Sequence, residues 1–157
     1  MGKVSTGVAG KIERFSAYVQ QQGLKWTRQR AVICGLFFRA AAESHIDVET
    51  LLAKVRDVEP GVGHATVYRT MKLLKEAGLA AEREFGDGRR RYEPGEVAHH
   101  DHLICTGCGS IVEFQNDTIE RLQDHVAQRH GFTITHHKME LYGLCRRCRS
   151  RRKKEAS

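Results

Sequence analysis

Two cysteine pairs constrain the second half of this chain more than any other feature of its sequence. Cys105-x-x-Cys108 is followed by Cys145-x-x-Cys148, with 36 residues between the two motifs. Each motif lets a single turn present two thiolates to one ion, so two motifs can complete a tetrahedral four-thiolate site. Disulfides or free thiols are the alternative, and a cytoplasmic chain disfavours stable disulfides. The four cysteines are therefore predicted to bind one structural Zn²⁺.

The domain that holds these cysteines has fewer than 60 residues, which is too few to rely on its hydrophobic core alone, so it needs a staple or a partner subunit. A zinc ion would fasten the start of this domain to its end. The remaining cysteine, Cys34, lies at helical spacing among apolar residues, and we expect it in a hydrophobic core.

The first part of the chain shows the apolar spacing of amphipathic helices. Thr27 and Asp47 stand before two of these segments as N-caps. Gly78 follows the last segment and is expected to end it. The predicted helices cover residues 11–22, 28–41, 48–57 and 66–77.

A hairpin signal follows the predicted helices. Gly86-Asp87-Gly88 separates two short runs, and its glycines can supply the positive φ angles of a tight turn. Helices followed by such a hairpin predict a winged helix over residues 1–95, which ends at a natural hinge formed by Pro94 and Gly95.

The rest of the chain alternates between strand-like and helical segments. Residues 102–105, 110–114 and 132–145 are predicted as strand, and Asp117 is expected to cap a helix that Gly131 closes. The predicted fold class is therefore α+β, with an N-terminal winged-helix domain and a small α/β domain over residues 96–148. Residues 149–157 are expected to form a basic mobile tail.

Charge and histidine are unevenly distributed along the chain. Residues 146–157 hold seven Lys or Arg against one Glu, whereas seven of the nine histidines lie in residues 97–145. A basic tail is commonly a solvated segment, and non-specific attraction to nucleic acid is the other interpretation. The His-rich middle is typical of a metal-binding region.

The sequence predicts a cytoplasmic protein without a membrane partner. It contains no apolar run long enough to span a bilayer. Its first residues also lack the apolar core of a signal peptide.

The stretch HHDHLICTGC, residues 99–108, holds more metal-binding side chains than one ion can use. In an extended segment, successive side chains point to opposite faces. His99 then shares a face with Asp101, and His100 shares the other face with His102. The stretch is predicted to serve two separate divalent ions such as Fe²⁺, Mn²⁺ or Zn²⁺, in addition to the cysteine site.

Enzymatic signatures are not found. A zinc deaminase needs a His-x-Glu motif before Pro-Cys-x-x-Cys, and neither occurs in this chain. A nucleophile elbow and a phosphate-binding loop are also missing. A binding protein is therefore favoured over an enzyme, although a metalloenzyme with an open coordination position stays as a rival interpretation.

An ordered set of motifs resembles the ferric uptake regulator family of bacterial metal-sensing repressors. The set consists of TRQR, HATVYRTMKLLKEAGL, HHDHLICTGCG, IVEF, HGF and ELYGLCRRC, over about residues 20–148. The resemblance implies a winged helix followed by an α/β dimerisation domain. It also implies a repressor of iron-uptake and iron-homeostasis genes that binds A/T-rich inverted-repeat operators as a homodimer, or as a tetramer, when loaded with Fe²⁺.

The resemblance also assigns two sets of metal ligands beyond the structural zinc. The regulatory hinge site corresponds to His45, Glu93, His100, His102 and Glu113. The second site, in the dimerisation domain, corresponds to His99, Asp101, Glu120 and His137. An ion in the hinge site would hold both domains in one orientation and so link metal binding to operator affinity.

DNA contacts are expected from the first domain. Thr66, Tyr68 and Arg69 project from the early turns of the helix that a winged helix inserts in the major groove. The alternative for Thr66 and Tyr68 is packing or helix capping. Lys25 corresponds to a family lysine that enters the minor groove of A/T-rich sites, and its alternative is a plain surface charge. Phosphate contacts are expected from Arg28 and Arg30.

The identity of the regulatory metal is narrowed by two positions. Peroxide sensors of the family carry Asp at one or both of the positions of Glu93 and Glu113, so two glutamates favour iron. No cysteine is available for the sensory site of a zinc sensor. A manganese-, zinc- or peroxide-responsive member of the family, and a metal-buffering protein without a DNA role, are the alternatives.

Overall fold

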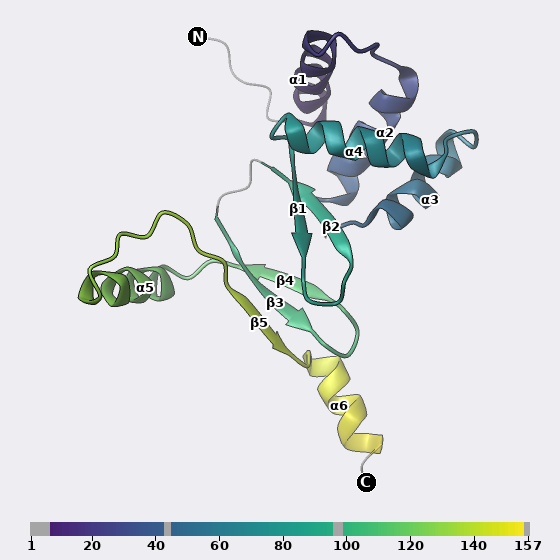
Figure 1. Cartoon of the computed structure of the whole chain (residues 1–157). Helices are drawn as coiled ribbons and strands as arrows, with labels where there is room; N and C mark the ends of the chain where they lie inside the picture. Colours follow the sequence, from purple (N-terminus) through teal and green to yellow (C-terminus); the bar gives the residue numbers. More distant parts are fainter. Residues whose placement is uncertain (1–6, 43–44, 96–98, 156–157) are drawn as a thin grey trace. The chain divides into compact units, whose positions relative to one another are not determined.

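The computed structural model of this chain describes residues 7–42, 45–95 and 99–155. The chain divides into two compact units, Met1–Val97 and Ala98–Ser157. Figure 1 shows the helical unit in purple to teal and the second unit in green to yellow. No helix within the described residues is long and apolar enough to cross a membrane.

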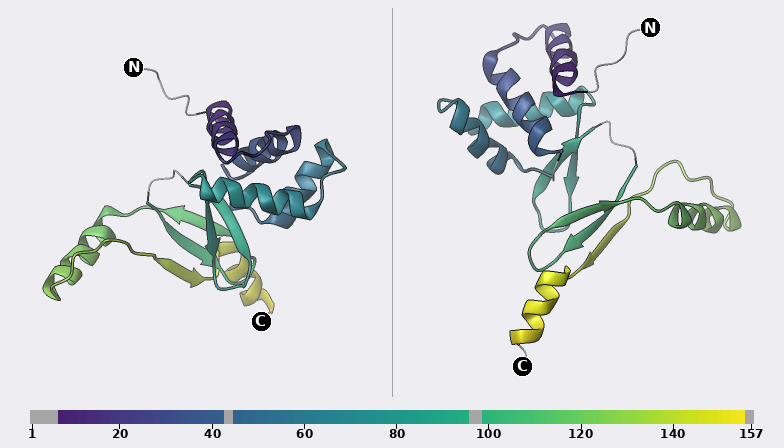
Figure 2. Two further views of the ribbon diagram at one scale, coloured as in Figure 1. Left: turned by 45° about the horizontal axis from the view of Figure 1, so that its top comes forward. Right: turned by 180° about the vertical axis from the view of Figure 1, so that it is seen from behind.

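The first unit is a helical bundle that carries a β-hairpin (Figures 1 and 2). Its core is formed by large apolar side chains from every helix, such as Phe15, Phe37, Leu51 and Met71, all of them fully or almost fully buried. Its elements are α1 (Val8–Gln21), α2 (Arg28–Ala40), α3 (Val48–Val58), α4 (His64–Glu76), β1 (Ala80–Glu84) and β2 (Arg90–Pro94).

The predicted helix ends of this unit agree with the structure to within one residue, except at two starts: α1 begins at Val8, ahead of the expected residue 11, and α4 also begins early. Thr27 Oγ1 accepts a hydrogen bond from the Arg30 amide at 3.2 Å, and Asp47 Oδ1 accepts one from the Thr50 amide at 2.7 Å. α4 begins at His64, ahead of the expected Thr66, because its N-cap is Gly63, which has no capping side chain for sequence analysis to detect.

The hairpin closes as its glycines indicated. β1 and β2 are antiparallel, and Gly86 and Gly88 have φ angles of 77° and 73°. At the end of the hairpin the chain returns to the loop after α4. A Cβ atom at Gly95 would lie 2.3 Å from the carbonyl oxygen of Gly78, so only glycine fits at this crossing.

The second unit is built on a sheet with strand order β4-β3-β5, in which β3 pairs antiparallel with β4 and parallel with β5 (Figures 1 and 2). The helix α5 connects β4 to β5 and has no buried residue. The unit therefore leaves apolar side chains exposed. Its elements are β3 (Asp101–Cys105), β4 (Ile111–Phe114), α5 (Asp117–Arg129), β5 (Glu140–Gly143) and α6 (Arg146–Glu155).

Two expectations for this unit are corrected by the structure. The cap of α5 is Asn116, whose Oδ1 accepts from the amides of Thr118 and Ile119, so Asp117 is the first helical residue. The strand expected over residues 132–145 is confined to Glu140–Gly143. β5 pairs only with His102–Cys105 of β3, and the residues before it connect α5 to the sheet.

The segment that was expected to be a basic tail is helical, because residues 146–155 form the helix α6. Arginine and lysine are good helix formers, so a run of them extends a helix that has already started. The start is fixed by Cys148, which is buried at the third position of α6.

Candidate metal centres and nucleic-acid interface

The four paired cysteines converge at one end of the sheet. Cys105 ends β3 and Cys108 lies in the turn after it, whereas Cys145 and Cys148 flank the start of α6. Their sulfur atoms all lie within 4.8 Å of one another. The sulfurs of Cys108 and Cys145 are 3.9 Å apart, close to the separation of about 3.8 Å that tetrahedral zinc–sulfur bonds require. Disulfide sulfurs are only about 2.05 Å apart. The four cysteines are free thiols in this structure, and their geometry fits zinc.

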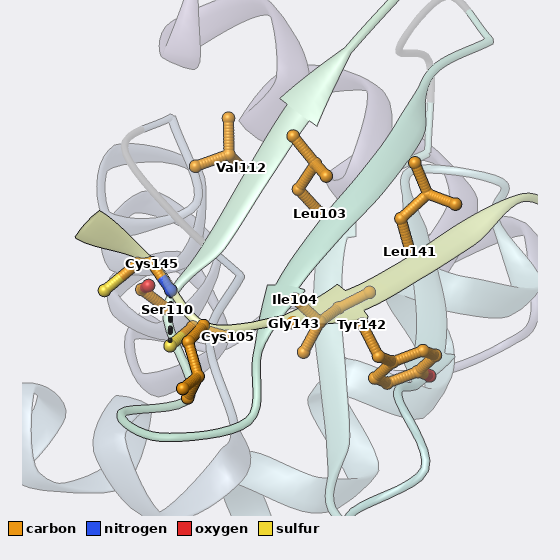
Figure 3. Close-up of a pocket in the computed structure, with 10 residues that line it drawn as sticks. Leu103, Ile104, Cys105, Ser110, Val112, Leu141, Tyr142, Gly143 and Cys145 are labelled. Carbon is orange, nitrogen blue, oxygen red and sulfur yellow. Dashed lines mark hydrogen bonds between the residues drawn. The ribbon is translucent and has the colours of Figure 1, made fainter. Parts of the chain in front are cut away.

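Hydrogen bonds prepare two of these thiols for metal binding. The Cys145 amide donates to Cys105 Sγ at 3.2 Å and lowers the pKa of the Cys105 thiol (Figure 3). The Ser110 hydroxyl lies 3.3 Å from Cys108 Sγ, and this contact, together with the Ser110 backbone and the neighbouring cysteines, lowers the pKa of Cys108 to about 5. Burial raises the pKa of Cys148 to about 12, so this thiol releases its proton when an ion binds.

Gly107 is a part of this centre that sequence analysis missed. A Cβ atom there would lie 3.0 Å from Cys148 Cβ and 3.1 Å from Cys148 Sγ. The turn between the first two cysteines is thus pressed against the fourth one. A glycine between the two cysteines of a C-x-x-C motif was the available signal.

A second cluster surrounds the buried carboxylate of Asp101. His99 Nε2 and His137 Nε2 lie 3.4 Å and 3.8 Å from Asp101 Oδ1. Glu120 lies opposite, 3.6 Å from His99 Nε2 and 3.5 Å from His137 Nε2. One donor atom from each of the four residues lies within 4.8 Å of the others.

The burial of Asp101 indicates what this cluster can hold. The residue is 1% exposed, and neither of its carboxylate oxygens has a hydrogen-bond partner within the described residues. A buried carboxylate without such a partner is costly. A divalent cation held by two imidazoles and two carboxylates would compensate its charge, so the donor set fits a metal ion.

The other face of the same stretch carries a separate group of ligands. The rings of His100 and His102 lie 4.9 Å apart, and His100 Nε2 lies 3.7 Å from Glu113 Oε1. His102 and Glu113 are cross-strand partners of β3 and β4. The sheet thus brings these three side chains together, separately from His99 and Asp101.

The remaining two predicted ligands, His45 and Glu93, lie side by side in the first unit. Ile46 and Tyr92 exchange backbone hydrogen bonds of 3.1 Å and 2.8 Å, which bring His45 beside Glu93. His45 Nε2 lies 2.8 Å from Glu93 Oε2. Adjacent ligands of one ion with bonds of about 2.1 Å are about 3 Å apart, so this pair fits two neighbouring positions of a metal.

The candidate DNA-contacting residues lie on the exposed side of the first unit. Tyr68 and Arg69 are exposed on α4, and Thr66 is half-buried. The neighbouring Val67 and Thr70 face the core. The geometry therefore leaves two of the three predicted residues of α4 available for a groove.

The basic residues before and within α2 are placed differently from one another. Lys25 is exposed. Arg28 Nε is ion-paired with Glu59 Oε1 at 2.5 Å, although its side chain is 81% exposed. The guanidinium of Arg30 donates to the backbone carbonyl of Lys25. Arg30 therefore shapes the loop before α2, while Lys25 points its charge to solvent.

Sequence analysis missed a groove next to the exposed face of α4. Its lining includes His64, Tyr68, Arg89 and Arg90, from the start of α4 and from the hairpin. The imidazole of His64 is stacked on the Tyr68 ring, with centroids 6.5 Å apart. The arginine run after Gly88 was the signal that could have placed the hairpin among the nucleic-acid contacts.

Comparisons with known proteins agree with this architecture. Residues 21–142 match the model of the ferric uptake regulator family. The ferric uptake regulation protein of Campylobacter jejuni is 42% identical over 145 residues, which cover 91% of each chain.

Solved structures show the same fold. The ferric uptake regulator of Helicobacter pylori, with three functional metal binding sites, superposes with a TM-score of 0.85 at 28% identity, over 95% of this chain and 97% of its own. A zinc-bound manganese uptake regulator superposes with a TM-score of 0.70 at 39% identity, over 84% of this chain and 98% of its own. The chain therefore belongs to the ferric uptake regulator family and is a metal-responsive transcription regulator.

Proposed function

We propose that this protein is a cytoplasmic repressor of iron-uptake and iron-homeostasis genes, which binds A/T-rich inverted-repeat operators when Fe²⁺ occupies its regulatory site. The observation that carries the proposal is the separation of donor chemistry within the second unit into a four-cysteine centre and the histidine–carboxylate cluster around Asp101. Each unit also carries a further histidine beside a glutamate. Thiolates suit a permanent zinc ion, whereas imidazole and carboxylate groups suit exchangeable Fe²⁺ or Mn²⁺.

The regulatory ion would join the two units of the chain. His45 and Glu93 already lie 2.8 Å apart in the first unit, and His100 lies beside Glu113 in the second. If one ion takes ligands from both pairs and from His102, it fixes one orientation of the DNA-binding unit. Operator affinity and metal affinity are then linked by the same coupling free energy.

The proposed assembly is a homodimer formed through the second unit. Leu103 of β3 pairs with Val112 of β4 and Leu141 of β5, and these three side chains point to the same side of the sheet (Figure 3). They are 44%, 55% and 46% exposed. A row of exposed apolar residues on a sheet is typical of an interface. A second copy would cover it, and pairing of dimers would give a tetramer.

A dimer would present two copies of α4 to an inverted repeat. We propose that Thr66, Tyr68 and Arg69 contact base edges in the major groove, and that Lys25 enters the adjacent minor groove. Half-sites about one helical turn apart, or a multiple of it, would match such a dimer. Arg28 and Arg30 are proposed as phosphate contacts.

Manganese is the second candidate for the regulatory ion. A manganese uptake regulator is 39% identical to this chain, close to the 42% of the ferric uptake regulation protein of Campylobacter jejuni. Nitrogen and carboxylate ligands bind both ions, and availability in the cell contributes to the selection.

A gel-shift experiment tests the proposal. An A/T-rich inverted repeat is titrated with the zinc-loaded protein in the presence of Fe²⁺ under anaerobic conditions, Mn²⁺, Zn²⁺ or a chelator. The proposal expects a shift with Fe²⁺ that the chelator reverses. Binding that is equal with and without regulatory metal would contradict it, and a response to Mn²⁺ alone would favour the manganese alternative.

A further inference from the structure

The two carboxylate oxygens of Glu93 have different partners. Oε2 lies 2.8 Å from His45 Nε2, whereas Oε1 accepts a hydrogen bond of 2.6 Å from Arg83 Nε. Arg83 lies on β1 and Glu93 on β2 of the hairpin. The Glu93 side chain is 3% exposed, and that of Arg83 is 33% exposed. A buried carboxylate is thus already paired with a permanent cation of the same unit.

This pairing has opposite consequences for the metal-free and the metal-bound protein. Without metal, the guanidinium compensates a buried negative charge that would otherwise be costly. With metal on Oε2, the same guanidinium is a second cation close to a divalent ion, and the two repel each other. Arg83 therefore lowers the free energy of the metal-free state and raises that of the metal-bound state.

We propose that Arg83 is a counter-charge residue that sets how much metal the regulator needs before it responds. The inference rests on the proposed role of Glu93 as a ligand of the regulatory ion. Arg83 touches the ligand and not the ion, so it acts by positioning and by charge. Its effect is to weaken metal binding, which moves the response to higher metal concentrations.

The imidazole partner of Glu93 has support that does not involve Arg83. The Phe85 ring packs edge-on against His45, with centroids 5.1 Å apart at 90°. The backbone bridge between Ile46 and Tyr92 also holds this segment against the hairpin. Removing the charge at position 83 should therefore leave the other ligand of this half-site in place.

The test uses the full-length, zinc-loaded protein and Mn²⁺, an air-stable probe, in competition with a metal-binding dye. Arg83→Gln keeps a hydrogen-bond donor but removes the charge, and we expect it to bind Mn²⁺ about tenfold more tightly at the regulatory site. Arg83→Lys keeps the charge and should stay within about threefold of the wild type. Arg90→Gln removes a charge of the same hairpin that pairs with Glu82, and serves as the matched control.

A second readout does not depend on the loaded protein. In urea without regulatory metal, Arg83→Gln should unfold at a lower midpoint than the wild type, because Glu93 has lost its counter-charge. Saturating Mn²⁺ should reduce this difference. Tighter binding together with a less stable metal-free state supports the inference, whereas unchanged or weaker Mn²⁺ binding by Arg83→Gln overturns it.

A His45→Ala variant separates this inference from the proposed function. Any Mn²⁺-binding component that is present in the wild-type titration and absent from that of His45→Ala is assigned to the regulatory site. If this substitution removes nothing, Glu93 and His45 are not metal ligands and both ideas fail. If it removes a component that Arg83→Gln leaves unchanged, only the role of Arg83 is wrong.

Discussion

At the scale of single residues, the buried carboxylate of Asp101 favours the binding of a cation. Its carboxylate is 1% exposed and lacks hydrogen-bond partners within the described part of the chain. Its nearest cationic candidates are imidazoles at 3.4 Å and 3.8 Å, which are charged only when protonated. Burial of this charge is therefore costly by itself, and a divalent ion held by the cluster would offset the cost.

An Asp101→Asn substitution tests whether the buried charge of this residue is what makes the cluster bind a metal ion. The amide carries no charge, so metal-induced thermal stabilisation from this site should disappear while the protein without regulatory metal keeps its stability or gains about 1 kcal/mol. Differential scanning calorimetry with and without Mn²⁺ measures both effects. Destabilisation of several kcal/mol without metal would show that the carboxylate has a structural role instead.

The zinc ligands make a second prediction for single residues. Cys105→Ser should release zinc and weaken both the second unit and the dimer, because the ion joins β3 to α6. Cys34→Ala is the matched control, since Cys34 is fully buried in the first unit and burial raises its pKa to about 12. Metal analysis and analytical ultracentrifugation give the answer. A Cys105→Ser protein with full zinc content and an intact dimer would refute the four-thiolate assignment.

Among the secondary-structure elements, the hairpin is fixed by its crossing with the loop after α4. Gly95→Ala would place a methyl group 2.3 Å from a backbone oxygen, which neither segment can avoid without moving. We expect a loss of about 2 kcal/mol or more in unfolding free energy. Gly61→Ala, where a Cβ atom meets nothing within 4 Å, should have little effect. Equal denaturation midpoints for the two variants would contradict this account.

The exposed side of α4 carries the prediction about DNA. Arg69→Ala should weaken operator binding by about 1–3 kcal/mol if the guanidinium reads a base. Lys25→Ala should weaken binding chiefly on sites with a narrow A/T-rich minor groove. Lys72→Ala, exposed further along α4, is the control. Small losses that are the same on all sequences would reduce Arg69 and Lys25 to phosphate contacts.

At the scale of the whole molecule, the decisive prediction concerns ligands from different units. His45→Ala and His100→Ala should both abolish metal-induced operator binding while the zinc and the dimer persist. Each change would remove the coupling of ~1–3 kcal/mol that a shared ion provides. His99→Ala should have a milder effect because it belongs to the other cluster. Gel shifts that stay metal-dependent in both the His45 and the His100 variants would disprove a shared ion.

Short-range geometry made much of the molecule predictable from its sequence. The caps Thr27 and Asp47, the hairpin turn and the C-x-x-C motifs depend on residues within a few positions of one another, and the structure confirms these elements of the fold. The separation of His99 and Asp101 from His100 and His102 follows from the alternation of an extended chain.

What only the tertiary structure decided depends on residues distant in the sequence. The strand expected over residues 132–145 shrank to Glu140–Gly143 because strand length is set by the partner β3. Arg83 contacts Glu93 because the hairpin pairs β1 with β2. Asp101 is buried only in the folded second unit. Local propensity is encoded by neighbouring residues, but burial and charge compensation arise only when separate segments pack, and in this chain they determine how the candidate metal sites are tuned.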